Sequence, residues 1–424
     1  MNRWMVIVGM LLGLGTSVPA ADLWDLPPLR YSDTPATDPI ATLAAELAAG
    51  TRTAEGATPL ARLRFILRLL DVPPESQILV FSKTSKQNAL IHPGHPRAIY
   101  FNENAYVGYV PGGLIEVIAH DPVLGVVFYH IDPGADARPP VIQRDLSDCL
   151  SCHGTARTES VPGMLVRSVF PDDTGQPVLP LGSFLTTHRS PIPERWGGYY
   201  VTGHSSLPHF GNRTFQESAN RPPASPSPAL ATLAGTIDTA PYLRPTSDIV
   251  ALMVLEHQCA VHNLLSAAAI QYRRLDWLGK SLNPEADPAT GAAGQHADHA
   301  AIGIVDALLF KDEAPLGDGG IDGDPAFQDQ FTARFPKTPA GHSLADFNLN
   351  DRLFKHRCSF MIYSKAFAAM PDRVKTAVFS RLRAALQPAA AIAPQLKPQE
   401  RSRIDEILRA TVPGYALPPT AIKD

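Results

Sequence analysis

The chain has 424 residues, of which 45% are hydrophobic and 18% are charged, and its formal net charge is −4. Such a chain can bury a sizeable core in one large domain or in two or three ordinary ones. This charge-poor, weakly acidic composition argues against a nucleic-acid partner and against an anionic membrane surface. Four cysteines are too few for a scaffold built on disulfides.

The first 21 residues have the pattern of a secretory signal peptide. Arg3 gives a positive start, an apolar run follows at 5–14, and small residues end it at 17–21. The run is about half of the ~20 residues that a membrane-spanning helix needs, although an uncleaved anchor is the alternative. No later stretch is apolar enough to span a bilayer. We therefore expect a periplasmic or secreted protein whose mature chain has no integral membrane segment.

The chain after the signal peptide begins with an irregular lead-in, expected at 22–59 because Pro, Ala and Thr are frequent there. An amphipathic pattern at 60–71 predicts a helix that Pro73 and Pro74 end. Residues 60–216 form a mainly β region, because runs of aromatic and β-branched residues are broken by Asn, Gly, Pro and Asp. These runs lie at 77–83, 97–102, 105–110, 114–121, 125–132, 164–170, 182–188 and 198–203.

The second half of the chain has a helical texture. A proline-rich linker is expected at 217–246, and Ser247 and Asp248 are candidates to cap the helix that follows. Helical patterns cover 247–279, 298–312, 325–335, 351–387 and 400–410. The predicted fold class is therefore α+β, with an N-terminal mainly β region followed by a mainly α-helical region at 247–424.

One short motif carries recognisable chemistry. Residues 149–153 read Cys149-Leu150-Ser151-Cys152-His153, and in an exported protein C-x-x-C-H is the attachment signature of a c-type haem. Two thiols three positions apart can form thioethers with the two vinyl groups of one porphyrin. His153 is then the proximal axial ligand of the iron. We expect one covalent haem c within the mainly β region, because the motif occurs once.

Three other interpretations of the motif stay open. A structural zinc site needs two more Cys or His residues at matching spacing, and none pairs convincingly. A thioredoxin-like redox pair needs a strand-to-helix junction and has no use for the adjacent histidine. A chance match can occur in any long chain. The signal peptide favours the haem.

The second axial position of such an iron has several candidate ligands. A His or Met there gives a six-coordinate electron carrier, and a vacant position gives a gas-binding or catalytic haem. His188 ranks first, because it ends a strand-like run before a loop, and His257 and His209 follow. His262 lies about 140° around a helix from His257, so these two do not bind one iron together. The further candidates are Met164, Met253 and Met361.

Other side chains near the motif are candidates for secondary roles. Arginines can pair with haem propionates through two parallel hydrogen bonds, with ordinary surface charge as the alternative; they are Arg157, Arg167, Arg189 and Arg195. Trp196 and Tyr199 either pack on the porphyrin or fill a core. Cys259 and Cys358 form either a disulfide between two helices or two buried free thiols.

Several blocks between about residues 60 and 410 resemble a family of exported bacterial proteins, the cytochrome c domain-containing proteins with a single C-x-x-C-H. The blocks are VFSKTS at 80–85, PRAIYFNENAYVGYVPGG at 96–113, residues 149–177 around the motif, THRSPIPERWGGYYVTG at 187–203, LMVLEHQ at 252–258 with His262 and Asn263, and RLFKHRCSFMIYSKAF at 352–367. The resemblance implies a haem c protein and brings no substrate with it. It favours His188, His209, His257 and His262 over the other histidines.

Two functional hypotheses follow from the motif. The first is a periplasmic mono-haem c-type cytochrome that passes single electrons between redox partner proteins. The alternative is a haem c-dependent oxidoreductase of peroxidase or oxidase type, or a haem-based sensor, with an open distal site. The length of the chain supports this alternative, because a simple haem c carrier needs only roughly a hundred residues. Its distal groups would be His188, Arg189, Glu194 and Arg195.

A third hypothesis is a structural subunit of a larger complex that carries the haem. The sequence does not decide whether the protein is an enzyme.

Overall fold

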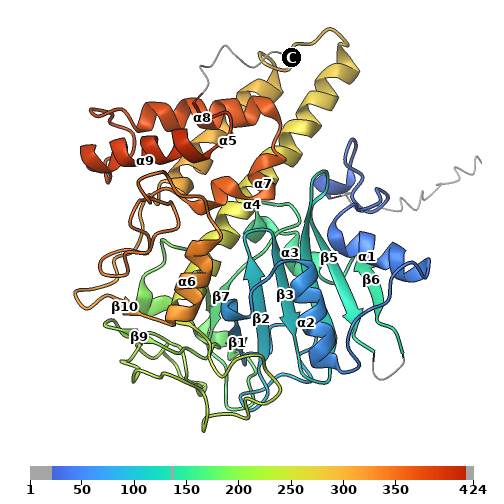
Figure 1. Ribbon diagram of the computed structural model, residues 1–424, viewed down its shortest axis with the longest axis vertical. Coiled ribbons are helices and arrows are strands. Elements are labelled where there is room, and N and C mark those ends of the chain that lie inside the picture. Colours follow the sequence, from blue (N-terminus) through green and yellow to red (C-terminus); the bar gives the residue numbers. More distant parts are fainter. Residues whose placement is uncertain (1–21, 135–137, 417–424) are drawn as a thin grey trace, which may run out of the picture.

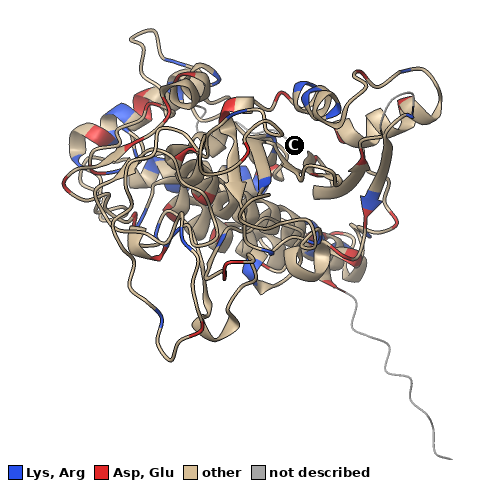
Figure 2. Cartoon of the chain, turned by 90° about the horizontal axis from the view of Figure 1, so that it is seen from below, with Lys and Arg blue, Asp and Glu red and all other residues tan. Residues whose placement is uncertain are grey.

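The computed structural model describes residues 22–134 and 138–416, so the predicted signal peptide lies outside the described residues. A six-stranded antiparallel sheet occupies the first half of the chain, and most helices follow in the second half (Figure 1). This arrangement confirms the predicted α+β class. Positively and negatively charged residues are interspersed along the chain (Figure 2).

The sheet is a meander whose strands lie side by side in sequence order. Its strands are β1 (Ile78–Val80), β2 (Arg97–Asn102), β3 (Ala105–Tyr109), β4 (Ile115–Asp121), β5 (Gly125–Asp132) and β6 (Val141–Asp145). The runs predicted between 77 and 132 all form strands, because their apolar and aromatic side chains fill both faces. The edge strand β6 was not predicted, since only Asp145 of its residues is buried.

One face of the sheet is covered by the N-terminal helices α1 (Pro39–Ala48) and α2 (Pro59–Leu69) (Figure 1). The Tyr129 hydroxyl of β5 donates a hydrogen bond to Asp38, which also caps α1. The expected irregular lead-in is therefore wrong at 39–48. Alanine is the best helix former and proline is suited to the first helical turn, so a Pro- and Ala-rich stretch with an Asp cap forms a helix.

The long helix α4 (Ile249–Leu282) runs past the ends of the strands, where its side chains contact Asn102 of β2 and His120 of β4. It begins at Asp248, whose carboxylate accepts the Ala251 N–H at 2.8 Å, and Gln258 donates to the Asn102 carbonyl of β2 at 2.7 Å. Within the described residues, α4 is the one helix long and apolar enough to cross a membrane, and 89% of its apolar window is buried in the protein. The expectation that no later stretch has enough apolar residues is therefore wrong. Here the apolar surface is covered by the sheet and by other helices.

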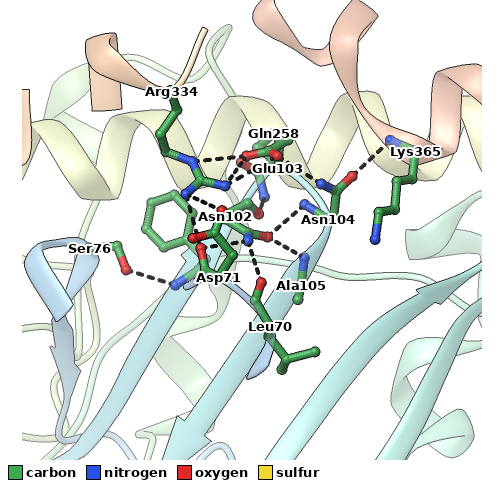
Figure 3. A network of polar contacts seen from close by, with 11 residues as sticks. Leu70, Asp71, Ser76, Asn102, Glu103, Asn104, Ala105, Gln258, Arg334 and Lys365 are labelled. Atoms are coloured by element: carbon green, nitrogen blue, oxygen red, sulfur yellow. Dashed lines mark hydrogen bonds and ion pairs between the residues drawn. The ribbon is translucent and has the colours of Figure 1, made fainter. Parts of the chain in front are cut away.

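The remaining helices of the second half mostly pack against α4. They are α5 (Ala292–Leu308), α6 (Pro325–Ala333), α7 (Lys365–Ala368), α8 (Asp372–Ala385) and α9 (Pro398–Thr411). Arg334, which follows α6, pairs with Asp71 at 2.9 Å and with Glu103 at 3.2 Å, so it ties the helical half to the sheet (Figure 3). One hydrophobic core extends through both halves.

Several shorter predictions differ from the structure. The predicted helix at 351–387 is wrong before residue 365, because 346–355 folds back as a hairpin with the Lys355 N–H donating to the Asp346 carbonyl at 2.7 Å. The runs at 164–170 and 182–188 shorten to the paired strands β7 (Arg167–Val169) and β8 (Ser183–Leu185). The run at 198–203 makes only isolated bridges. The small strands β9 (His204–Ser205) and β10 (Ile321–Asp322) pair with each other.

Candidate functional site

The C-x-x-C-H motif folds as one helical turn directly after the edge strand of the sheet. Cys149 caps the short helix α3 (Leu150–His153), and Asp145 at the end of β6 accepts the Cys149 N–H at 3.0 Å. Positions i, i+3 and i+4 share one side of a helix. The turn therefore presents Cys149, Cys152 and His153 together. Cys152 is exposed, Cys149 is half-buried, and both are free thiols.

One ring nitrogen of His153 is engaged by the backbone. Its Nδ1 lies 2.8 Å from the Gly163 carbonyl oxygen, and Phe128 of β5 packs against the ring with centroids 5.4 Å apart. An imidazole that donates from Nδ1 to a carbonyl keeps its lone pair on Nε2. Burial lowers the pKa of His153, which favours this neutral form. His153 therefore has one fixed nitrogen and one that can bind a metal.

The segment that holds His153 is itself held by α4. The Asn263 side chain accepts the Met164 N–H at 2.9 Å and donates to the Met164 carbonyl at 2.6 Å. A Cβ on Gly163 would clash with the Asn263 amide oxygen, so only glycine fits there. Sequence reasoning missed this role of Asn263. The sequence did contain one indication, because asparagine is a poor helix former and Asn263 lies within the apolar part of a long helix pattern.

A histidine and an aspartate lie beside the Cys149 thiol. Its Sγ is 3.6 Å from His130 Nε2, and His130 Nδ1 is 3.4 Å from an Asp145 oxygen. One ligand atom from each of the three residues lies within 4.8 Å of the others. Burial, with Asp145 next in effect, raises the pKa of the Cys149 thiol to about 12. A zinc site would thus have His130 and Asp145 as further ligands beside Cys149, which the sequence did not indicate. Cys152 does not belong to this group.

Two of the sequence blocks meet at Glu116 of β4, which pairs with His130 on the neighbouring strand β5. Its carboxylate accepts hydrogen bonds from Ser85 at 2.9 Å and from Arg97 at 2.9 Å. Burial would raise the pKa of Glu116, but Arg97 and the hydrogen bonds outweigh it and lower that pKa. The part of the sheet near the motif therefore carries an ion pair, between Arg97 and Glu116.

The first two distal candidates, His188 and His257, lie against each other in the core. Their Nδ1 atoms are 3.1 Å apart, and His257 Nε2 is 2.7 Å from the Ser359 hydroxyl. The His257 ring also stacks on Phe310 with centroids 4.0 Å apart. Both ring nitrogens of His257 are therefore engaged.

The other candidate histidines have partners of their own. His209 Nδ1 accepts the Gly211 N–H at 3.0 Å, while its ring meets the edge of Trp196. His262 lies between Tyr106 and His120, at 3.3 and 3.4 Å. Over residues 22–134 and 138–416, no hydrogen bond or ring contact joins these histidines to the motif. Each of His188, His257 and His209 stays a prediction as a sixth ligand.

A cavity of about 170 Å³ lies between the segment after the motif and α4, with His188, Met164 and Asn263 in its wall. Pockets for drug-sized ligands have about 300–1,000 Å³, so this cavity is smaller than a pocket of that kind. Arg157 and Arg189 also line it.

The remaining sequence candidates are placed as follows. The Arg195 guanidinium pairs with Glu256 at 2.7 Å inside the core, so it is not available to a propionate. Arg167 donates to the Ser183 hydroxyl at 3.1 Å. Cys259 and Cys358 are buried free thiols, which leaves the disulfide alternative without support. Buried apolar side chains include Trp196, Tyr199, Met253 and Met361.

Comparisons of the chain with protein-family models, with curated proteins and with solved structures find no match. The resemblance described from the sequence blocks therefore stays a prediction.

Proposed function

We propose that the protein is an exported c-type cytochrome that transfers single electrons, with one haem c attached through Cys149 and Cys152 and ligated by His153. One observation carries the proposal. The Nδ1 of His153 is fixed by the Gly163 carbonyl at 2.8 Å, on a turn that presents both thiols on the same side. When bound, the haem supplies one-electron redox chemistry at its iron.

The chain's own residues support this role. A backbone carbonyl on Nδ1 fixes the tautomer and ring orientation of a metal-binding histidine and makes it a better ligand. Asn263 holds that carbonyl's segment through the Met164 backbone. Cys152 is exposed, so the attached group would have an edge near the surface, where a periplasmic redox protein could approach.

The test is expression of the full chain, with its own signal peptide, in a bacterial host that has haem-ligation machinery. We expect the mass of one haem on the peptide that contains residues 149–153, and a coloured protein. Cys149→Ser and Cys152→Ser should each abolish the double attachment. The matched control is His204→Ala, at an exposed histidine outside the motif, which should leave attachment unchanged.

A colourless protein without added mass would contradict the proposal. If such a protein held one zinc ion that His130→Ala removes, the site beside Cys149 would be a zinc site instead.

The second candidate function is a haem c-dependent oxidoreductase or a haem-based sensor. It is favoured by the cavity beside the segment after the motif, because His188 and Arg189 line it. Both ring nitrogens of His257 are engaged, whereas His188 Nε2 has no hydrogen-bond partner, so His188 stays the first candidate for a sixth ligand. Electron paramagnetic resonance of the oxidised protein separates the two. A low-spin signal supports the electron carrier, and a high-spin signal that shifts with cyanide supports the open site.

A further inference from the structure

The loop between α6 and α7 brings two histidines and an aspartate together, away from the C-x-x-C-H turn. This loop is drawn in orange in Figure 1. One ligand atom from each of His342, Asp346 and His356 lies within 4.8 Å of the other two. The three residues span only fifteen positions of one segment, so the local fold of that segment creates the cluster.

Two turns place these side chains. The Thr338 N–H donates to the His342 carbonyl at 2.9 Å, and the His342 N–H donates back to the Thr338 hydroxyl at 3.2 Å. In the hairpin that follows, the Lys355 N–H donates to the Asp346 carbonyl at 2.7 Å. His356 therefore leaves the hairpin next to the position where Asp346 enters it.

An aromatic base fixes the hairpin. Phe347 and Phe354 form a bridge across it, and their rings stack with centroids 5.2 Å apart. Phe331 of α6 contacts both rings, at 5.3 and 6.0 Å. Because these aromatic contacts fix the hairpin backbone, binding of an ion would require adjustment of side chains only.

The cluster has unused ligand atoms. His356 is 7% exposed, and its Nε2 has no hydrogen-bond partner. A buried polar atom without a partner costs about 1–3 kcal/mol, so a ligand there would remove a penalty. Asp346 accepts one hydrogen bond with one oxygen, from the Ser343 N–H at 3.0 Å. The His342 and His356 rings lie edge to face with centroids 5.9 Å apart.

We propose that His342, Asp346 and His356 bind one divalent transition-metal ion, for which Zn²⁺ is the probe. Two imidazoles and one carboxylate are ligands that zinc and its first-row neighbours accept. His342 and Asp346 are partly exposed, so an ion can enter and water can take the remaining position. The ligand atoms would close onto the ion to bonds of about 2.0–2.2 Å. The site does not depend on the haem.

The experiment is a calorimetric titration of the purified full chain with Zn²⁺ after treatment with a chelator, together with thermal unfolding. We expect one equivalent to bind and the melting temperature to rise. Asp346→Asn and His342→Ala, at partly exposed positions, should each weaken binding by more than about tenfold while the unloaded proteins melt as the wild type does.

Two controls assign the bound ion. His299→Ala changes an exposed histidine on α5 and should bind as the wild type does. His130→Ala removes a possible ligand beside Cys149 and should also leave the binding unchanged. The proposal is overturned if no Zn²⁺ binds, if His342→Ala and Asp346→Asn bind it like the wild type, or if His130→Ala abolishes the binding.

Discussion

The turn that carries His153 and the core pair of His188 and His257 use the same side chain in opposite ways. At the turn, a backbone carbonyl engages one ring nitrogen of His153 and the other is left to a ligand. In the core, His257 has no exposed surface and uses both nitrogens, toward His188 and Ser359. The chemistry of a histidine thus depends on which nitrogen the fold leaves free as well as on burial.

The two regions are also stabilised differently. The turn depends on the Asn263 amide, which accepts the Met164 N–H and donates to the Met164 carbonyl. The core pair lies beside an ion pair, because Arg195 donates to the His188 carbonyl at 3.2 Å and to Glu256 at 2.7 Å. Variants that remove one interacting side chain from the turn or from the core pair test how much each region contributes to stability.

The largest effect is expected for Arg195→Met. It leaves the Glu256 carboxylate unpaired in the core, and removal of one partner from a buried ion pair costs about 3–5 kcal/mol. Urea unfolding should show this loss in the free energy of unfolding at neutral pH. The control is Arg52→Met, which breaks an exposed pair with Glu46 and should cost about 1 kcal/mol or less. Equal losses for the two variants would show that the buried pair does not stabilise the core.

The next effect is acid lability of the core pair. Burial, and then the nearby Arg189 and Arg195, lowers the pKa of His188 to about 3, and burial also lowers that of His257. At these two positions the unfolded chain binds protons below about pH 6.5 and the folded chain does not, so their contribution to stability is constant above that pH and falls as the pH decreases. At about pH 5.5 each histidine should cost about 1.4 kcal/mol, or about 3 kcal/mol for the pair.

Urea unfolding at about pH 7.5 and about pH 5.5 measures the summed loss for all buried histidines, since burial also lowers the pKa values of His120, His209 and His356. A variant of His188 isolates the part that this residue contributes. His188→Gln removes one of the two titrating groups and should lose about 1.4 kcal/mol less stability over that range than the wild type. The control is His204→Gln, at an exposed position, which should keep the wild-type dependence. An unchanged dependence in His188→Gln would show that His188 is already protonated in the folded protein.

The smallest effect is expected for Asn263→Ala. It removes two hydrogen bonds and leaves the buried N–H and carbonyl of Met164 without partners, at a cost of about 2 kcal/mol. Thermal unfolding checks this cost. In a haem-loaded protein the absorption spectrum should also change, because the Gly163 carbonyl would no longer be held against His153. Asn283→Ala, at the exposed end of α4, should change neither quantity.

Much of the fold was predictable where local pattern decides it. The strands from Ile78 to Asp132 and the long helix that begins after Asp248 agree with the sequence interpretation, because alternation and capping are local signals. The helix at 39–48 was missed because proline was taken as a sign of irregular chain. The hairpin at 346–355 was missed because its pairing is held by aromatic side chains from α6, which no local pattern reveals.

By itself the sequence determined the α+β class and the spacing that places Cys149, Cys152 and His153 on one helical turn, because both follow from periodicity within a few residues. Only the tertiary structure decided which nitrogen of His153 is free and that Asn263, 99 positions from Met164, holds its support. It also decided that His342, Asp346 and His356 share one place. The first two depend on how distant segments pack, and the third depends on a hairpin that Phe331 of α6 supports, so no local pattern in the chain encodes them.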